Sequence, residues 1–302
     1  MNILITGATG FIGSNLVNRL LQEGHNIFCT LRENKENPFG EDKVKSIIIR
    51  SNNLNESIEF FDENNIEGIV HLASFVISSD HKPEDIENLI DSNIIFGSFL
   101  LEIASHTKIK WFINTGTYWQ NYKSNDYSPV NLYAATKQAF EDIAKYYYET
   151  KKFKFCTLRL YDTYGKGDTR DKIFNLWNEI SKTGETLDMS PGEQIIDFTY
   201  IDDIIDAYML LIYYLNNNSV KVKNGDVFYL QSPERNSLKE LSHIFENITN
   251  KKLNINWGSR PYKNREVMEP IMTNKSIPGF KHKITLENGI KKIFVENENK
   301  LL

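Results

Sequence analysis

Residues 2–13 read NILITGATGFIG, an apolar run that leads directly into Gly7, Gly10 and Gly13. Apolar residues then recur at helical spacing over residues 16–21, so the order predicts a strand, a glycine turn and a helix. Glycines let the backbone approach a pyrophosphate closely, and the following helix N-terminus supplies amide donors. We therefore predict that a dinucleotide binds at Gly7, Thr9, Gly10, Phe11, Ile12 and Gly13.

The same alternation continues through the first half of the chain. Further apolar runs typical of buried strands lie at 26–31, 45–49, 68–72, 110–115 and 153–160. The clearest helical periodicity between them covers residues 84–105 and 132–150. Strands that are apolar throughout, alternating with helices, indicate a parallel sheet covered on both faces. The predicted fold class is α/β, a doubly wound Rossmann sheet with a smaller C-terminal α/β substrate lobe.

After residue 160 the alternation loosens. We expect a helix at 168–183, a strand at 194–200, a helix at 203–215 capped by Asp202 or Asp203, a strand at 227–231, and a helix after Ser237, which has capping-box spacing to Glu240. The predicted domains are a dinucleotide-binding domain at 1–165, to which residues 194–230 return, and a substrate lobe formed mainly by 166–302.

Composition narrows the class of protein. The chain has 302 residues and a net charge of -5, so it carries no basic field for nucleic acid or an anionic membrane. No leader-like segment opens it, and no apolar run reaches the roughly 18 residues that span a bilayer. We expect a cytoplasmic protein with Cys29 and Cys156 buried, and we find no metal-ligand spacing among the histidines.

We expect the cofactor also to contact the ends of the second and fourth predicted strands. An acidic residue usually follows the second strand in NAD enzymes, whereas Arg32 stands there in this chain. Its planar guanidinium suits a 2'-phosphate, so we predict NADP(H) as the preferred cofactor, with NAD(H) possible. Leu72 and Ala73 end the fourth strand and would pass close to the cofactor, while His71 is interpreted as a packed structural histidine.

The spacing Tyr-x-x-x-Lys occurs three times, in Tyr133 with Lys137, Tyr147 with Lys151, and Tyr148 with Lys152. Tyr133 lies near the start of the helix predicted at 132–150, so it faces the sheet edge where ligands bind in open parallel sheets. The other two pairs lie about four turns further along, at the far end of that helix. Position therefore favours Tyr133 and Lys137 as the chemical pair.

Proton transfer is the chemistry that this pair suits. An adjacent ammonium favours phenolate, so we expect Lys137 to lower the pKa of Tyr133 while also binding the nicotinamide ribose. Thr115 and Thr117 end the fifth strand at the same edge of the sheet, and Thr115 is expected to hydrogen-bond the substrate oxygen. The predicted catalytic residues are Thr115, Tyr133 and Lys137.

These motifs resemble the extended short-chain dehydrogenase/reductase family, whose members act mostly on nucleotide-linked sugars. The resemblance extends over nearly the whole chain and includes residues 159–168 and 197–203. Residues 192–194 and 266–268 look most like the CDP-3,6-dideoxyhexose synthases, which are 4-ketoreductases. The resemblance implies a homodimer through the two long helices and substrate contacts from Thr115, Thr117, Tyr161, Asp168, Arg170, Lys263 and Arg265.

Three departures from the family pattern affect the substrate pocket. Tyr118, Trp119 and Gln120 replace the usual Val-Tyr-Gly, and Lys166 replaces a proline. The arginine that grips the diphosphate in relatives aligns nearest to Lys263, with Arg260 and Arg265 beside it.

The leading hypothesis is NADPH-dependent reduction of the C4 keto group of a nucleotide-linked, plausibly CDP-linked, deoxy sugar for cell-surface polysaccharide synthesis. An NAD-dependent 4-epimerase and a non-catalytic dinucleotide sensor are the alternatives.

Overall fold

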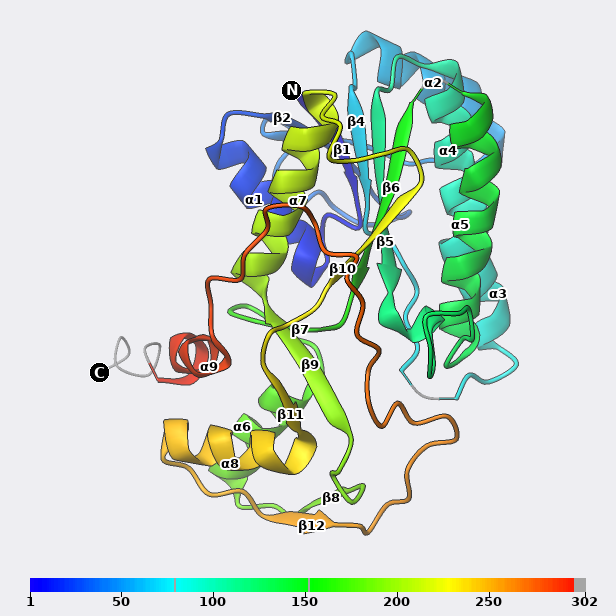
Figure 1. Ribbon diagram of the computed structural model, residues 1–302. Coiled ribbons are helices and arrows are strands. Elements are labelled where there is room, and N and C mark those ends of the chain that lie inside the picture. Colours follow the sequence, from blue (N-terminus) through cyan, green and yellow to red (C-terminus); the bar gives the residue numbers. More distant parts are fainter. Residues whose placement is uncertain (79, 152, 296–302) are drawn as a thin grey trace.

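A seven-stranded parallel sheet forms the centre of the protein, in the order β10-β6-β5-β4-β1-β2-β3 (Figure 1). The computed structural model describes residues 1–78, 80–151 and 153–295, so Lys152 lies outside the described residues. The predicted doubly wound α/β sheet is confirmed. Its strands are β1 (Asn2–Thr6), β2 (Asn26–Thr30), β3 (Val44–Ile47), β4 (Gly68–His71), β5 (Trp111–Thr117), β6 (Lys154–Leu160) and β10 (Asp226–Leu230).

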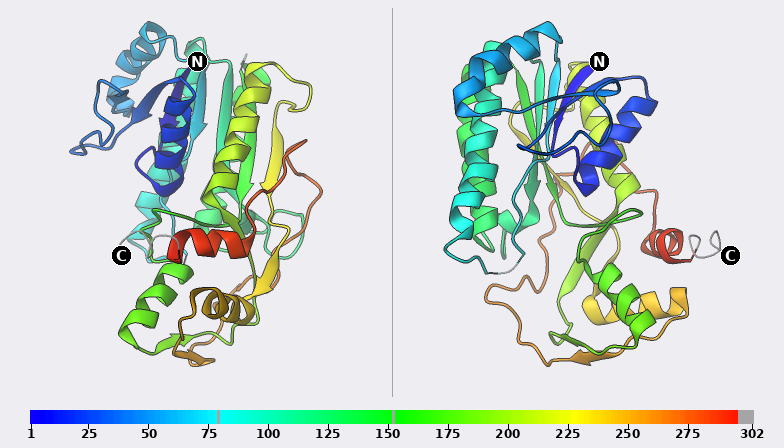
Figure 2. Two further views of the ribbon diagram at one scale, coloured as in Figure 1. Left: turned by 90° about the vertical axis from the view of Figure 1, so that its left-hand side faces the viewer. Right: turned by 180° about the vertical axis from the view of Figure 1, so that it is seen from behind.

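Helices cover both faces of this sheet (Figures 1 and 2). Two helices lie on one face and three on the other, and each layer buries its own apolar cluster. Ile113 belongs to one cluster and Phe112 to the other, because successive residues of a strand point to opposite faces. The two layers are α1 (Phe11–Gln22) with α7 (Ile201–Asn216), and α2 (Leu54–Glu63) with α4 (Phe96–His106) and α5 (Leu132–Thr150).

The helix expected at 84–105 is continuous but changes pitch. It consists of α3 (Asp85–Ile90), a π-helical turn η2 (Asp91–Ile95) and α4. Short 3-10 turns also occur at η1 (Ser51–Asn53) and η3 (Tyr118–Gln120).

The remaining elements gather at the carboxyl ends of the strands (Figure 2). A three-stranded sheet runs β11-β9-β7, and a two-stranded sheet pairs β12 with β8. Within residues 194–230, β10 joins the main sheet whereas β9 pairs with β7 and β11. These elements are β7 (Asp162–Tyr164), α6 (Ile173–Thr183), β8 (Leu187–Met189), β9 (Ile195–Tyr200), β11 (Arg235–Ser237), α8 (Leu238–Thr249), β12 (Ile255–Trp257) and α9 (Leu286–Phe294).

Two predicted helix starts are wrong. The helix expected at 168–183 begins only at Ile173, because Asp168 and Arg170 bind each other in a turn before it. Neither predicted aspartate caps α7, since Tyr200 is its N-cap residue. The carboxylate of Asp203 instead accepts hydrogen bonds from the backbone amides of residues 283 and 284, so it ties the C-terminal segment to α7.

The expected start of α8 and the expected burial of both cysteines are borne out. The capping box of Ser237 and Glu240 starts α8, and both Cys29 and Cys156 are free and buried. None of the helices in the described part of the chain is both long and apolar enough to cross a bilayer. No cluster of His, Cys, Asp and Glu that would hold a metal ion occurs within residues 1–78, 80–151 and 153–295.

Candidate active site

The glycine turn joins β1 to α1 as predicted. Gly7 has φ of +66°, and a Cβ there would lie 2.7 Å from the backbone nitrogen of Ala73. A Cβ on Gly13 would lie 2.1 Å from the carbonyl oxygen of Gly7. Thr9 and Gly10 are exposed, while Phe11 and Ile12 begin the helix half-buried. The turn therefore offers an open helix N-terminus, and its tight packing excludes side chains at positions 7 and 13.

Thr6 fixes the neighbouring strand end against this turn. Its hydroxyl accepts hydrogen bonds from the amides of Leu72 (3.1 Å) and Ala73 (3.0 Å). With both acceptor positions used, its hydrogen goes to Nδ1 of His71 at 2.8 Å. His71 is thereby a neutral, buried structural histidine, as expected, and burial holds its pKa well below the usual value.

Asn93, which the sequence analysis missed, organises the other side of the site from the π-turn. Its amide oxygen accepts hydrogen bonds from the Ser74 hydroxyl and the Phe75 amide, and its nitrogen donates to the Thr136 hydroxyl. Thr136 in turn donates to the carbonyl of Tyr133. Asn93 thus connects the β4 loop to the start of α5. A lone asparagine in a helical pattern carries no signal for such a role.

Tyr133 and Lys137 both lie on the buried side of α5, with 9% and 2% of their surfaces exposed. Burial raises the pKa of Tyr133 to about 12, and a hydrogen bond with Ser74 opposes this only in part. The sequence predicted a lowered pKa for Tyr133, whereas the pKa is raised here because the phenolate would be desolvated. The rings of Trp119 and Tyr133 meet edge to face at 6.3 Å.

Lys137 carries its ammonium on a side chain that is almost fully buried. Among the described residues it makes no hydrogen bond or ion pair. Burial lowers its pKa to about 8, and the charge of Glu141 opposes that shift. A buried ammonium without a partner is costly, so this site suits a ligand that supplies hydroxyl acceptors. Together with the glycine turn, the Lys137 ammonium fits a dinucleotide.

Glu141 lies one turn beyond Lys137, in a buried polar network. Its carboxylate binds Arg159 at 2.6 Å and accepts from the amide of Gln120 at 3.0 Å. Arg159 also donates to Asn121 and Tyr229. The network occupies the space beside Gly116, where a Cβ would lie 2.8 Å from the Arg159 side chain. Gln120, a departure from the family pattern, is thus a structural member of this network.

The two threonines of β5 make different contacts. The Thr115 hydroxyl is 2.6 Å from the hydroxyl of Tyr208 on α7. The Thr117 side chain accepts from the amide of Trp119 and caps the η3 turn. The structure therefore places Thr115 half-buried at the sheet edge, while Thr117 is buried in the turn that follows.

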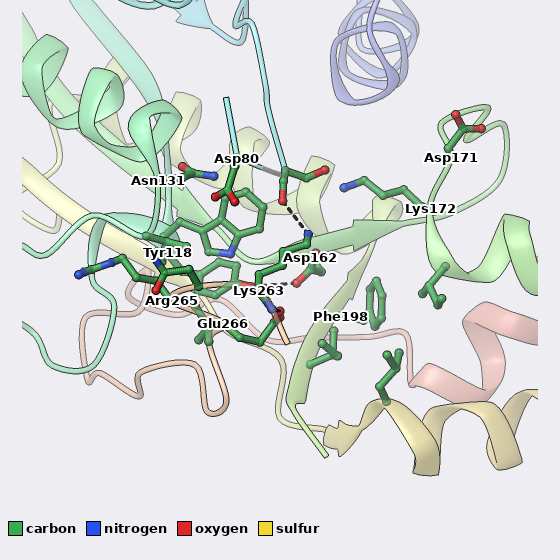
Figure 3. Close-up of a pocket in the computed structure, with 18 residues that line it drawn as sticks. Asp80, Tyr118, Asn131, Asp162, Asp171, Lys172, Phe198, Lys263, Arg265 and Glu266 are labelled. Carbon is green, nitrogen blue, oxygen red and sulfur yellow. Dashed lines mark hydrogen bonds between the residues drawn. The ribbon is translucent and has the colours of Figure 1, made fainter. Parts of the chain in front are cut away.

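A cleft of about 260 Å³ opens between the sheet edge and the smaller sheets (Figure 3). Lys172 and Lys263 reach into it from separate segments, and Asp162 lies between them. Asp162 accepts a hydrogen bond from Tyr118 at 3.2 Å. Burial raises the pKa of Asp162, and the ammonium of Lys172 opposes this shift. The cleft is therefore a mixed-charge pocket with an aromatic wall.

Two predicted substrate contacts line this cleft. The Lys263 ammonium donates to the carbonyl of Ser78 at 2.8 Å, which brings the C-terminal segment against the β4 loop. Arg265 donates to the Ser128 hydroxyl at 2.8 Å and stacks over Tyr122. Both cations lie at the mouth of the cleft, on the same segment.

The other predicted substrate contacts lie beside the cleft. Tyr161 stacks on Tyr118 with ring centroids 4.7 Å apart and donates to the carbonyl of Ile271. Asp168 binds Arg170 through both carboxylate oxygens, and that guanidinium lies over the Phe11 ring at 4.6 Å. The structure thus brings Asp168 and Arg170 to the start of α1.

Lys172 and Asp162 line the cleft, although neither was predicted as a substrate contact. Lys172 was placed inside a helix, although it is the N-cap residue of α6. Asp162 follows β6 directly, so its position at a strand end was the available signal.

Arg32 lies exposed just after β2, and its side chain makes no hydrogen bond or ion pair within the described ranges. Its neighbour Glu33 is paired with Arg50, which follows β3. The acid nearest the expected adenosine ribose is thus neutralised, while Arg32 remains available.

Known proteins resemble this chain along most of its length. The model of the NAD dependent epimerase/dehydratase family matches residues 3–224. CDP-abequose synthase of Salmonella muenchen is 28% identical over 303 residues, which cover 98% of each chain. CDP-abequose synthase of Yersinia pseudotuberculosis is 28% identical and covers 94% of this chain and 96% of its own.

Solved structures share the whole fold. UDP-glucuronic acid 4-epimerase from Bacillus cereus, in complex with UDP-glucuronic acid and NAD, matches with a TM-score of 0.83 at 22% identity over the full length of both chains. MoeE5 in complex with UDP-glucuronic acid and NAD matches with a TM-score of 0.82, also at 22% identity and full coverage. At this identity the likeness concerns the fold alone.

Proposed function

This chain belongs to the NAD-dependent epimerase/dehydratase family, and from that premise we propose that it reduces the C4 carbonyl of a nucleotide-linked deoxy sugar with NADPH. The observation that carries the proposal is the buried pair of Tyr133 and Lys137 at the start of α5. Similarity along nearly the whole chain to enzymes named CDP-abequose synthase supports a CDP-linked deoxyhexose as the substrate, made for cell-surface polysaccharide.

NADPH, when bound, supplies the hydride. Tyr133 donates its hydroxyl proton to the carbonyl oxygen as the hydride adds to C4, so that the ketone becomes a secondary alcohol. A phenol with a pKa of about 12 keeps its proton at neutral pH, which suits a donor in net reduction. Lys137 stabilises the phenolate that remains, and Thr115 hydrogen-bonds the substrate oxygen. Lys172, Lys263 and Arg265 hold the diphosphate in the cleft.

The choice of NADPH rests on Arg32. Its exposed guanidinium suits a 2'-phosphate, and the neighbouring acid, Glu33, is paired with Arg50. Replacing Arg32 with Ala should raise KM for NADPH about tenfold, equivalent to about 1.4 kcal/mol, with little effect on KM for NADH. Equal effects on both cofactors would contradict this assignment.

A panel of CDP-, UDP-, GDP- and dTDP-linked 4-keto sugars, assayed by loss of NADPH absorbance, tests the function. The expected result is turnover of the CDP-linked class. The control is Tyr133→Phe, which should bind NADPH and leave every sugar unreduced.

A 4-epimerase is the second candidate, because the family model and the solved neighbours are of NAD enzymes. It would retain NAD through purification and interconvert C4 epimers without net consumption of cofactor. Those two observations together would replace the reductase proposal. Carbonyl reduction of any kind would exclude a non-catalytic sensor.

We also propose a homodimer through α4 and α5. The exposed Tyr146 on α5 and the exposed Ile95 just before α4 support this face. Light scattering that shows a single-chain mass at working concentrations would rule it out.

A further inference from the structure

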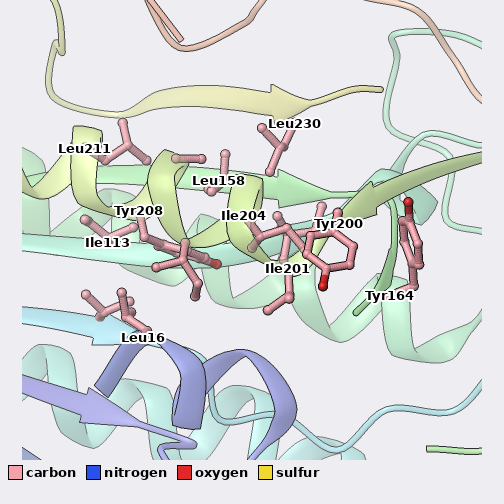
Figure 4. Close-up of a cluster of buried hydrophobic side chains, with 14 of the residues drawn as sticks. Leu16, Ile113, Leu158, Tyr164, Tyr200, Ile201, Ile204, Tyr208, Leu211 and Leu230 are labelled. Carbon is pink, nitrogen blue, oxygen red and sulfur yellow. The ribbon is translucent and has the colours of Figure 1, made fainter. Parts of the chain in front are cut away.

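Tyr208 is a fully buried tyrosine on α7 whose hydroxyl reaches the edge of the active site. Figure 4 shows its ring among core side chains that include Ile113 and Leu158. The ring has no exposed surface, yet its hydroxyl is 2.6 Å from Oγ1 of Thr115. This contact joins the helix layer on one face of the sheet to the carboxyl end of β5.

The direction of this hydrogen bond follows from what surrounds the two hydroxyl groups. Within the described part of the chain, each side-chain hydroxyl makes this hydrogen bond and no other. If Thr115 were the donor, the hydrogen of the Tyr208 phenol would be buried without an acceptor, which is unfavourable. Thr115 is half-buried, so its own hydrogen has access to the site. Tyr208 is therefore the donor and Thr115 the acceptor.

Tyr208 does not itself exchange a proton with substrate. It has no exposed surface, and burial raises its pKa, so it stays protonated. Tyr133 lies close enough for its charge to raise that pKa further. Of the residues proposed to act in the reaction, Thr115 is the one that Tyr208 contacts directly.

We propose that Tyr208 is a positioning residue that donates to Thr115, so that the Thr115 hydrogen is kept for the substrate carbonyl oxygen beside Tyr133. A threonine hydroxyl has one hydrogen and rotates freely, so an acceptor-only contact would draw that hydrogen away from the site. When Tyr208 donates to the Thr115 oxygen, the Thr115 hydrogen cannot point at Tyr208 and is directed towards the site. This inference rests on the proposed carbonyl reduction, in which Thr115 contacts the substrate oxygen.

Tyr208→Phe removes one hydroxyl and keeps the ring in the core. Tyr214→Phe is a matched control, since Tyr214 is also a buried tyrosine of α7, and its hydroxyl donates to the carbonyl of Pro278 at 2.8 Å. We expect Tyr208→Phe to lower kcat about tenfold with KM unchanged, which corresponds to about 1.4 kcal/mol. Tyr214→Phe should retain the wild-type kcat, and the two variants should show similar losses in Tm.

A double-mutant cycle separates positioning from a general structural effect. Thr115→Val should lower kcat about 100-fold, as for loss of one donor to a developing oxyanion. Because Tyr208 acts through Thr115, the double variant should be no slower than Thr115→Val alone. Multiplied losses in the double variant, or an unchanged kcat in Tyr208→Phe, would overturn the inference.

Crystal structures of the variants give a measurement that does not depend on turnover. Thr115 should occupy one side-chain rotamer in the wild type and in Tyr214→Phe, and more than one in Tyr208→Phe. If no sugar in the panel is reduced by the wild type, the proposed function fails, and the rotamer comparison still decides the contact. An unchanged Thr115 rotamer in Tyr208→Phe would refute the positioning role.

Discussion

The two ends of α5 carry the same Tyr-x-x-x-Lys spacing in opposite surroundings. At the start, Tyr133 and Lys137 are buried beside the glycine turn and the β4 loop. At the far end, the Tyr147 hydroxyl donates to Glu102 at 2.8 Å, and Lys151 is where the helix ends. Both tyrosines have a pKa of about 12, so acidity alone does not distinguish them. The nearby ionisable group differs: it is a buried ammonium with no hydrogen bond or ion pair to the described residues in one case, and a surface carboxylate in the other.

The difference teaches that a motif becomes a site through its place in the fold. Ligands meet open parallel sheets at the carboxyl ends of the strands, and only the first turns of α5 lie there. The far end of the helix lies near the opposite edge, where polar side chains pair with one another.

The largest expected effect is the difference in turnover between variants of the two tyrosines, Tyr133 and Tyr147. Tyr133→Phe should lower turnover by on the order of 1,000-fold, because it removes the proposed proton donor. Tyr147→Phe should retain full turnover. Steady-state kinetics with NADPH measures both, and cofactor titration by fluorescence should give similar binding for the two variants. Comparable rates in the two variants would show that the spacing carries no positional meaning.

The next effect compares two acids of the same helix. Glu141→Gln breaks a buried ion pair with Arg159 and should lower the free energy of unfolding by about 3 kcal/mol. Glu149→Gln removes an exposed pair with Lys145 at 3.8 Å and should change it by less than about 1 kcal/mol. Urea denaturation of each variant checks the difference, and equal losses would contradict the burial argument.

Lys137 provides a test with a defined pH dependence. Its pKa is about 8 in the folded protein against 10.5 for the ordinary group. Between these values the unfolded chain binds more protons, so this group makes stability rise as the pH increases from about 8 to 10.5. Below pH 8 the buried charge lowers stability by up to about 3 kcal/mol, at about 1.4 kcal/mol for each pH unit between the two pKa values.

Lys137→Met should therefore be more stable than the wild type at pH 7, by about 2 kcal/mol after some loss of favourable contacts. The gain should shrink towards pH 10.5, while turnover is largely lost. Lys151→Met is the control and should change neither stability nor turnover. Denaturant melts at the two pH values measure the effect, and a variant less stable at pH 7 would refute it.

The smallest effect concerns the helix ends themselves. The Asn131 side chain accepts from the amide of Ala134 and donates to the carbonyl of Ile77, so it caps α5 and holds the β4 loop. Asn131→Ala should cost about 1 kcal/mol. Thr150→Ala at the other end removes only a local bond to Tyr146 and should be nearly neutral. Thermal melts of both variants measure the two losses of stability. A larger loss in Thr150→Ala than in Asn131→Ala would contradict the prediction.

Much of the fold was predictable because its elements are long and strongly periodic. The glycine turn, the strands of the main sheet and α5 all follow from local pattern. The start of α6 was not predictable, since the mutual binding of Asp168 and Arg170 competes with the helix there. The predicted cap of α7 was wrong for a related reason. The Asp203 carboxylate binds the backbone of a segment 80 residues away and does not cap the helix.

Some residues of the candidate site were likewise predictable from the sequence, and others were not. Glycine spacing, Tyr133, Lys137 and Arg32 are recognisable from residue type and position along the chain. Asn93, Lys172 and Tyr208 are not, because each acts through a contact with a distant segment.

By itself, the sequence determined a doubly wound sheet, a glycine turn for a dinucleotide and one favoured Tyr-Lys pair, because these depend on local spacing and on the order of elements. Only the tertiary structure decided the protonation of that pair, the cleft between Lys172 and Lys263, and the donor behind Thr115. The physical reason is that burial sets the pKa of Tyr133 and Lys137. Burial and hydrogen-bond direction in turn depend on side chains that only the folded chain brings together.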